Sequence, residues 1–230
     1  YVAFNSTATN LGAPPTNGLS NVYVSHIGGA TMLTWFIEWV SRGYDGKVPT
    51  GSCGRPSMSD VGLVAFECHA TATRMVPSDT NDCTDVFVAD VDGLAIERVS
   101  TTSADVGATA FPYESCASQY PSISADGTLV AFESYARTLV AGDTNGVVDI
   151  FVKNRDTRAL ARVMADIGDP QTGFQPNGTS LRPAISGDGA FVAYESQATN
   201  LHYSPSSLPE PPQGVYRVYR TALAPATGTT

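Results

Sequence analysis

Residues 121–134 read Pro-Ser-Ile-Ser-Ala-Asp-Gly-Thr-Leu-Val-Ala-Phe-Glu-Ser, and residues 142–152 continue as Gly-Asp-Thr-Asn-Gly-Val-Val-Asp-Ile-Phe-Val. The apolar runs predict three short strands, around Ile123, 129–133 and 150–152. Asp126-Gly127 is the turn signal between the first two strands, because glycine readily adopts a positive φ there. The stretch is therefore typical of a small antiparallel sheet.

The same stretch recurs along the chain. The second strand is predicted near 1–5, 63–67, 129–133 and 191–195, where the sequence reads Tyr-Val-Ala-Phe, Leu-Val-Ala-Phe twice and Phe-Val-Ala-Tyr. The third strand is predicted near 21–25, 85–89, 149–153 and 214–219, and the first strand is found only at 56–59, 121–124 and 183–186. Short strands at a fixed period indicate a propeller or solenoid, since one unit cannot bury its faces alone.

The pattern Pro-x-Ile-Ser-x-Asp-Gly-x-Leu-Val-Ala-Phe-Glu-Ser resembles the TolB-like β-propeller repeat, and the resemblance spans nearly the whole chain. It implies an all-β fold: a β-propeller of about four blades, each a four-stranded antiparallel sheet with the Pro-x-Ile-Ser strand innermost. The repeats lie near 1–55, 56–120, 121–182 and 183–224 within one domain, 1–224, and a Thr-rich tail follows at 225–230. The outer strand of the first blade is expected within 32–40. The fold implies little about activity, because such propellers serve as scaffolds, binding platforms and enzyme appendages.

The count of strands predicts incomplete closure of the propeller. The sequence begins at Tyr1 within a second strand, so the first blade lacks its innermost strand, and residues 221–230 are too few to supply an outer strand, a turn and an innermost strand. Two interpretations are open. A segment from a neighbouring copy fills the gap and gives head-to-tail assembly, or further residues of a longer chain close the ring.

Composition excludes several classes of protein. The 230 residues are 42% hydrophobic, enough for a sizeable core, and no window has a sustained helical period or an apolar run long enough to span a membrane. A formal charge of −9 without a basic patch argues against binding to nucleic acid.

The four cysteines, Cys53, Cys68, Cys83 and Cys116, contain no C-x-x-C pair, which argues against a zinc ribbon. All four are expected on one face of the propeller, and we favour the pairs Cys68–Cys83 and Cys53–Cys116 among the three possible connectivities. Four reduced thiols in a cytoplasmic protein are the alternative.

Two loops carry an oxygen-rich pattern. Asp79-x-Asn81-x-x-x-Asp85 is repeated as Asp143-x-Asn145-x-x-x-Asp149, which resembles part of a calcium loop. The alternative is turn chemistry alone, in which these side chains cap their own backbone.

A second repeated set comprises Glu67, Glu133 and Glu195, each after the Ala-Phe or Ala-Tyr pair. These carboxylates either ring a cation or substrate, or accept hydrogen bonds within their own blades, which we favour. Catalytic motifs such as Gly-x-Ser-x-Gly and His-Glu-x-x-His are absent from the sequence, and His26, His69 and His202 occupy unrelated positions.

The sequence therefore predicts a non-catalytic, extracellular structural or interaction propeller that self-assembles into filaments by strand exchange, with calcium as the candidate cofactor. Its partners would be copies of itself or another protein. The alternative is the propeller domain of a secreted hydrolase or glycan-binding protein. N-glycosylation signals at Asn5 and Asn177 agree with secretion, and the periplasm or cell surface is also compatible.

Overall fold

In the computed structural model, residues 1–11, 18–26, 36–69, 75–91, 95–109, 115–164, 175–201, 212 and 214–223 are described. Within these ranges all regular structure is β-strand, which forms four separate antiparallel sheets. The all-β, blade-like architecture expected from the repeats is thereby confirmed.

Each repeat forms one sheet, and within it the strands are paired in sequence order. The first sheet contains β1 (Val2–Ser6), β2 (Asn21–His26) and β3 (Phe36–Trp39), and the second contains β4 (Cys53–Met58), β5 (Leu63–His69), β6 (Thr84–Asp90) and β7 (Ile96–Arg98). The third contains β8 (Ser118–Ile123), β9 (Leu129–Ser134), β10 (Asp149–Asn154) and β11 (Leu160–Arg162), and the fourth contains β12 (Ser180–Ile185), β13 (Phe191–Ser196) and β14 (Arg217–Ala222). We call these sheets blades 1 to 4.

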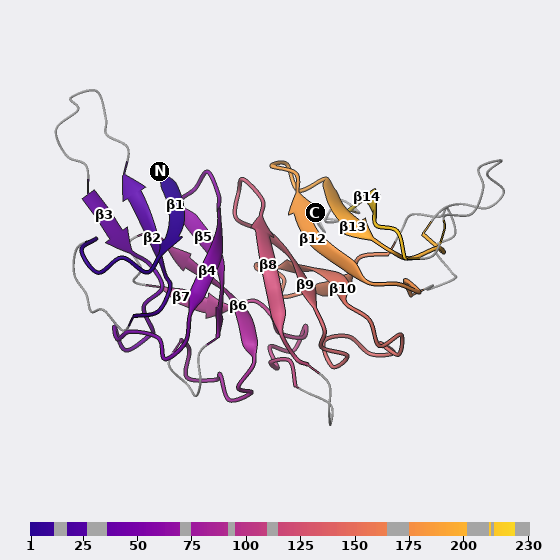
Figure 1. Ribbon diagram of the computed structural model, residues 1–230, viewed down its shortest axis with the longest axis horizontal. Helices are drawn as coiled ribbons and strands as arrows, with labels where there is room; N and C mark the ends of the chain where they lie inside the picture. The colour runs from indigo at the N-terminus through magenta and orange to yellow at the C-terminus, as the bar shows by residue number, and fades with distance from the viewer. Residues whose placement is uncertain are drawn as a thin grey trace.

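The blades follow one another along an arc (Figure 1). Blade 1 lies at one end of the view and blade 4 at the other, while β4, β8 and β12 are the innermost strands of their sheets. In the described part of the chain, blade 1 has no strand inside β1. The outer strand of blade 4 was expected within residues 221–230, of which the structure describes only 221–223.

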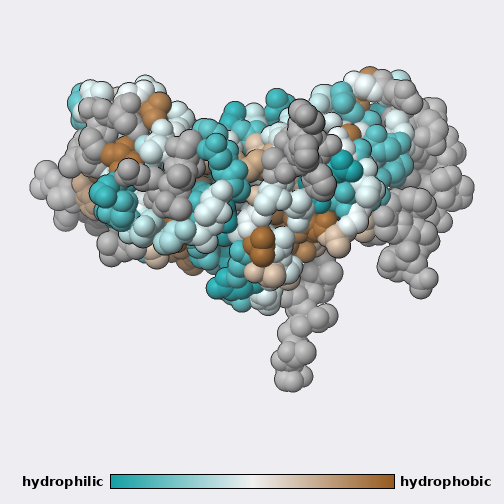
Figure 2. Space-filling model, turned by 90° about the horizontal axis from the view of Figure 1, so that it is seen from below, coloured by the Kyte–Doolittle hydropathy of each residue, from teal (hydrophilic) through white to brown (hydrophobic). Residues whose placement is uncertain are grey.

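Apolar side chains fill the spaces between blades, because alternate residues of a strand face opposite neighbours. One cluster joins blades 1 and 2, a second joins blades 2 and 3, and a third joins blades 3 and 4. An aromatic pair across the two middle strands of blades 2 to 4 faces the preceding blade, and blade 1 carries the equivalent pair: Phe4–Tyr23, Phe66–Phe87, Phe132–Phe151 and Tyr194–Tyr219. On the face seen from below, the coloured residues are mainly hydrophilic, with hydrophobic residues in small groups (Figure 2).

The innermost strands begin three residues earlier than predicted. They start at Cys53, Ser118 and Ser180, and each contains its proline rather than beginning with it. A register shift surrounds each proline, between Gly54 and Ser57 in β4 and at the equivalent places in β8 and β12. A bulge releases one residue from the ladder, so a proline without an N–H is tolerated there.

The other strand predictions are confirmed with one shift. The second strands start at residues 2, 63, 129 and 191, and the first three third strands lie where they were expected. The last third strand, β14, begins at Arg217 instead of 214, because its partner strand β13 ends at Ser196, which pairs with Arg217. The turn at Gly127 has the expected positive φ of 75°.

All four cysteines form disulfides, but the favoured connectivity is wrong. The structure joins Cys53 to Cys68 and Cys83 to Cys116. Because β4 starts at Cys53, this residue lies directly opposite Cys68 in the β4–β5 ladder. Cys83 instead reaches across to the segment before β8, so the second bridge joins blade 2 to blade 3.

Tryptic digestion without reduction should distinguish the two connectivities. The sequence cuts into fragments 48–74, 75–98 and 99–137 around the cysteines, since trypsin does not cleave Arg55-Pro56. The structure predicts fragment 48–74 alone with an internal bridge, and fragments 75–98 and 99–137 linked to each other. A mass spectrum in which all three fragments are linked in one species would contradict this pairing.

Candidate functional site

The innermost strands carry a repeated backbone feature next to each proline. Arg55, Tyr120 and Arg182 have φ values of 48°, 51° and 51°, in the left-handed region that side-chain-bearing residues rarely occupy. This conformation costs roughly 1–2 kcal/mol per residue. It occurs at the same bulge in three successive blades, so the fold requires it.

The bulge directs a backbone N–H toward the preceding blade, where a buried carboxylate accepts it. Glu67 Oε2 lies 3.0 Å from the Tyr120 nitrogen, and Glu133 Oε2 lies 2.7 Å from the Arg182 nitrogen. Burial raises the pKa of Glu133, and the hydrogen bond from Arg182 opposes that rise. The favoured interpretation, acceptance within the same blade, is therefore incomplete, because these carboxylates link one blade to the next.

A hydroxyl and a backbone ladder repeat the link. Ser57 Oγ accepts from the Ile123 nitrogen at 3.2 Å, and Ser122 Oγ accepts from the Ile185 nitrogen at 3.0 Å. The turns add a backbone bond of 2.9 Å from Ala125 N to Gly187 O. Blades 2 and 3, and blades 3 and 4, are thus joined by the same polar contacts.

Blade 4 carries the same carboxylate without that link. Glu195 accepts from Arg182 Nη1 at 2.9 Å, within its own blade, and among the described residues it accepts no N–H from a further blade. Across the ladder from Glu195, Val218 is 78% exposed, and Arg220 stacks over the Phe191 ring at 4.4 Å. This exposed side of blade 4, which we call the blade 4 end face, is the candidate site for contact with another molecule.

Replacing Glu133 should destabilise the protein more than replacing Glu195. Glu133→Ala leaves the Arg182 N–H unsatisfied between blades, which costs about 1–3 kcal/mol. Glu195→Ala removes only an exposed ion pair and should cost less than about 1 kcal/mol. Urea unfolding at low protein concentration measures both. Equal losses would show that the link between blades contributes nothing specific.

In the Asp-x-Asn-x-x-x-Asp loops an arginine lies between the two aspartates. Arg98 Nη1 is 2.9 Å from Asp79 Oδ1 and 3.3 Å from Asp85 Oδ2, and all three side chains are buried. A Cβ at Gly107 would lie 2.3 Å from Arg98 Nη2, so the absence of a side chain there makes room for the guanidinium.

The loop of blade 3 has the same arrangement. Arg162 Nη1 is 3.2 Å from Asp143 Oδ1 and 3.4 Å from Asp149 Oδ2. Sequence reasoning missed these arginines, although Arg98-Val99 and Arg162-Val163 occupy equivalent places in the two repeats and carried a usable signal.

The asparagines of both loops organise backbone and side chains. Asn81 Oδ1 accepts from the Cys83 nitrogen at 3.0 Å, and Asn145 Nδ2 donates to Asp149 Oδ2 at 2.9 Å. Among the described residues, no group of three or more His, Cys, Asp or Glu side chains has the arrangement of a metal site. Calcium binding at these loops stays a prediction, to be tested by the effect of a chelator on the melting temperature.

Burial controls the protonation of these aspartates. Desolvation raises the pKa of Asp79 to about 6, with a further rise from the neighbouring Asp85 charge and an opposing effect from Arg98. Desolvation likewise raises the pKa of Asp149 to about 6, against hydrogen bonds from Asn145 and the charge of Arg162.

These shifts predict a pH-dependent stability. A carboxyl whose pKa is higher in the folded protein binds a proton more tightly in the folded than in the unfolded chain. Its contribution to the free energy of unfolding is therefore fully present below about pH 4 and is lost as the pH rises through about 6. Asp149→Asn should therefore reduce the fall in melting temperature between pH 4.5 and pH 7 by a few degrees. Asp60→Asn, at an exposed aspartate, is the control. An unchanged pH dependence in Asp149→Asn would contradict the raised pKa.

The remaining sequence candidates are not brought together. Asn5 donates to Ser20 Oγ at 3.1 Å, and Asn177 Nδ2 donates to Thr199 Oγ1 at 2.8 Å; glycosylation of either asparagine stays a prediction. His26 contacts Glu38 at 3.0 Å, whereas His202 lies outside the described residues.

No family model matches the chain, and no curated protein matches it. Among solved structures it is similar to a protein described as TolB from Agrobacterium tumefaciens, at 13% identity and a TM-score of 0.49, covering 88% of this chain and 53% of that one. TolB from Acinetobacter baumannii is 15% identical, with a TM-score of 0.44 over 91% of this chain and 39% of that one. The tricorn protease is 13% identical, with a TM-score of 0.44 over 82% of this chain and 17% of that one.

The chain spans about half or less of the length of these proteins. The blade architecture expected from the repeat rests on the four sheets and their strand pairing. In the described part of the chain, no helix is long and apolar enough to cross a membrane.

Proposed function

We propose that the chain is a non-catalytic extracellular interaction module that associates with copies of itself through its first and last blades. The observation that carries the proposal is the exposure, at the two ends of the arc, of residues whose equivalents are buried between blades. Two disulfides are typical of proteins that fold in an extracellular or periplasmic compartment.

At the blade 4 end, Val218 stands opposite Glu195 in the ladder. The equivalent partners of Glu67 and Glu133 are Val86 and Ile150, which are 0% and 1% exposed. Val218 is 78% exposed, so blade 4 presents the apolar half of a contact that is covered in the two preceding blades.

At the blade 1 end, Val2 occupies the position that would complete that contact. Its repeat equivalents are Val64, Val130 and Val192, all 0% exposed and packed against the preceding blade. Val2 is 46% exposed. We call this side of the first sheet the blade 1 end face.

The two end faces are complementary because internal contacts already join their equivalents. Val86 and Val130 belong to one apolar cluster between blades, and Ile150 and Val192 belong to another. Val218 of one copy would meet Val2 of the next in the same way, with Glu195 accepting an N–H from that copy. Such a contact joins two different surfaces, so it is head-to-tail.

A non-catalytic role is supported by how the repeated carboxylates are used. Glu67 and Glu133 hold the next blade, and the buried aspartates hold arginines. Strand donation onto the inner edge of β1 remains a second mode of the same assembly. Its proposed donor, residues 222–230, lies outside the described residues except for Ala222 and Leu223.

A single charge on the blade 4 end face should prevent assembly. Light scattering of the intact chain should show a mass that grows with concentration, and Val218→Glu should remain monomeric because a carboxylate would be buried against Val2. Val61→Glu is the matched control, since Val61 is 62% exposed on a turn of blade 2. An intact chain that is monomeric at high concentration, or a Val218→Glu variant that assembles normally, would contradict the proposal.

A further inference from the structure

Arg220 is a charged residue at a position that is apolar in the other three blades. It lies opposite Ala193 in the β13–β14 ladder. The residues opposite the equivalent alanines of blades 1 to 3 are all valines, namely Val24, Val88 and Val152. These valines are 0%, 2% and 7% exposed, whereas Arg220 lies in the exposed class. The blade 4 end face therefore differs at this point from the internal contacts between blades.

Arg220 is held on the end face by the ring of Phe191. Its Cζ lies 4.4 Å from the centre of that ring, which is a cation–π contact. Phe191 begins β13, and the residues that begin the equivalent strands of blades 2 and 3 are Leu63 and Leu129. The change from leucine to phenylalanine thus accompanies the change from valine to arginine. Together they place a cation against an aromatic ring on one face.

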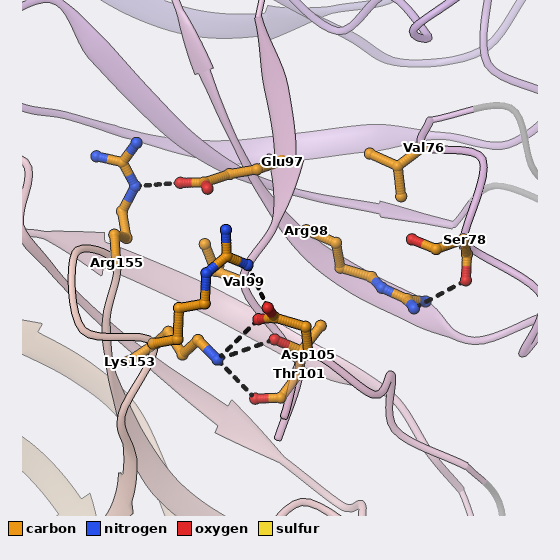
Figure 3. A pocket seen from close by; sticks show the side chains of 10 residues that line it. Val76, Ser78, Glu97, Arg98, Val99, Thr101, Asp105, Lys153 and Arg155 are labelled. Carbon is orange, nitrogen blue, oxygen red and sulfur yellow. Dashed lines mark hydrogen bonds and ion pairs between the residues drawn. The ribbon is translucent and has the colours of Figure 1, made fainter. Parts of the chain in front are cut away.

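Arg220 has no carboxylate partner among the described residues. Cations between blades 2 and 3 do have such partners. Arg155 pairs with Glu97, as Figure 3 shows, and Arg158 pairs with Asp105. A guanidinium is planar, so one side of Arg220 covers Phe191 and the other side is available to a group of a partner molecule.

The equivalent valines indicate which group a second copy would bring to Arg220. Val88 belongs to the same apolar cluster as Phe132 and Phe151, the aromatic pair of the following blade. The valines of blades 1 and 3 likewise share a cluster with the aromatic pair of the blade that follows them. In a head-to-tail contact, Arg220 would therefore face the aromatic pair of blade 1 in the next copy.

The blade 1 end face offers that aromatic surface and no carboxylate. Phe4 and Tyr23 are paired across β1 and β2, with ring centroids 5.8 Å apart, on the side of the sheet that carries Val2. Phe4 is partly exposed, whereas the equivalent phenylalanines of blades 2 and 3 are fully buried. Glu38 is the carboxylate within β1 to β3, and it lies on the opposite side because it pairs with Val24.

We propose that Arg220 determines the partner of the blade 4 end face by stacking between Phe191 of its own chain and Phe4 of a second copy. This inference rests on the proposed self-association and names the contact that makes it selective. Cation–π attraction strengthens when the cation is removed from water between two rings. A partner surface without a ring would leave the charge of Arg220 buried and unpaired, which is unfavourable.

The test uses two chains that can form only one contact with each other. Val2→Glu blocks the blade 1 end face of the first chain, and Val218→Glu blocks the blade 4 end face of the second. Mixed, they should form a one-to-one complex, measured by light scattering and titration calorimetry. Arg220→Gln in the first chain and Phe4→Leu in the second should each weaken binding about fivefold or more. The two changes together should weaken it little further, because they remove the same contact.

Arg217→Gln in the first chain is the matched control. Arg217 is on the same strand, and a residue three positions from Arg220 points to the opposite side of the sheet. This variant should bind like the parent chain. Arg220→Lys keeps the charge without the planar group, so it should also weaken binding. Thermal unfolding verifies that each variant folds.

The outcomes separate this inference from the proposed function. If the two blocked chains form no complex, self-association through the end faces is wrong and the role of Arg220 falls with it. If they form a complex that Arg220→Gln does not weaken, or if the losses from Arg220→Gln and Phe4→Leu simply multiply, only the role of Arg220 is overturned. An equal loss in Arg217→Gln would overturn it too, because a general effect of charge would then explain the result.

Discussion

The last three blades of the arc depend on one kind of contact, a buried glutamate that accepts the N–H of a left-handed residue in the next blade. Glu67 holds Tyr120 and Glu133 holds Arg182 in this way. The left-handed residue costs roughly 1–2 kcal/mol, whereas a hydrogen bond to a charged group contributes about 1.5–3 kcal/mol. The gain and the cost are of similar size, so the contact mainly sets where each blade sits rather than adding much stability. Apolar burial between blades supplies the larger favourable term.

The repeat period of the sequence predicted the blades, because each strand is a short segment whose apolar pattern can be recognised locally. Leu63, Leu129 and Phe191 start equivalent strands, and alternation alone places their neighbours on two faces. The cysteine pairing could not be predicted in the same way, because it depends on where β4 begins. A proline at position 56 indicates the start of a strand, yet here a bulge carries it inside the strand.

The residue that a side chain contacts in the next blade could likewise not be predicted from a local sequence pattern. Glu133 follows an Ala-Phe pair in the sequence, and nothing near it shows that its partner is Arg182. Arg98 and Arg162 were missed for a related reason. The sequence of an acidic loop is compatible with a bound metal ion or with a guanidinium, and the fold brings the arginine to the loop from the outer strand. The arginine then supplies the positive charge that a buried aspartate pair needs.

The geometry of the end faces bears on what kind of assembly this chain can form. A copy added at blade 4 would repeat the internal contact, because the equivalents of Val218 and Val2 share the apolar clusters between blades. It would therefore continue the rotation that relates blade 3 to blade 4. If that rotation carries no rise along its axis, the copies close into a ring of fixed size; if it carries a rise, they form an open helix. The links between blades bear on which outcome follows, since a glutamate and a bulge join blade 2 to blade 3 and blade 3 to blade 4. The proposed assembly and the arrangement of blades within one chain would in this sense depend on the same kind of contact.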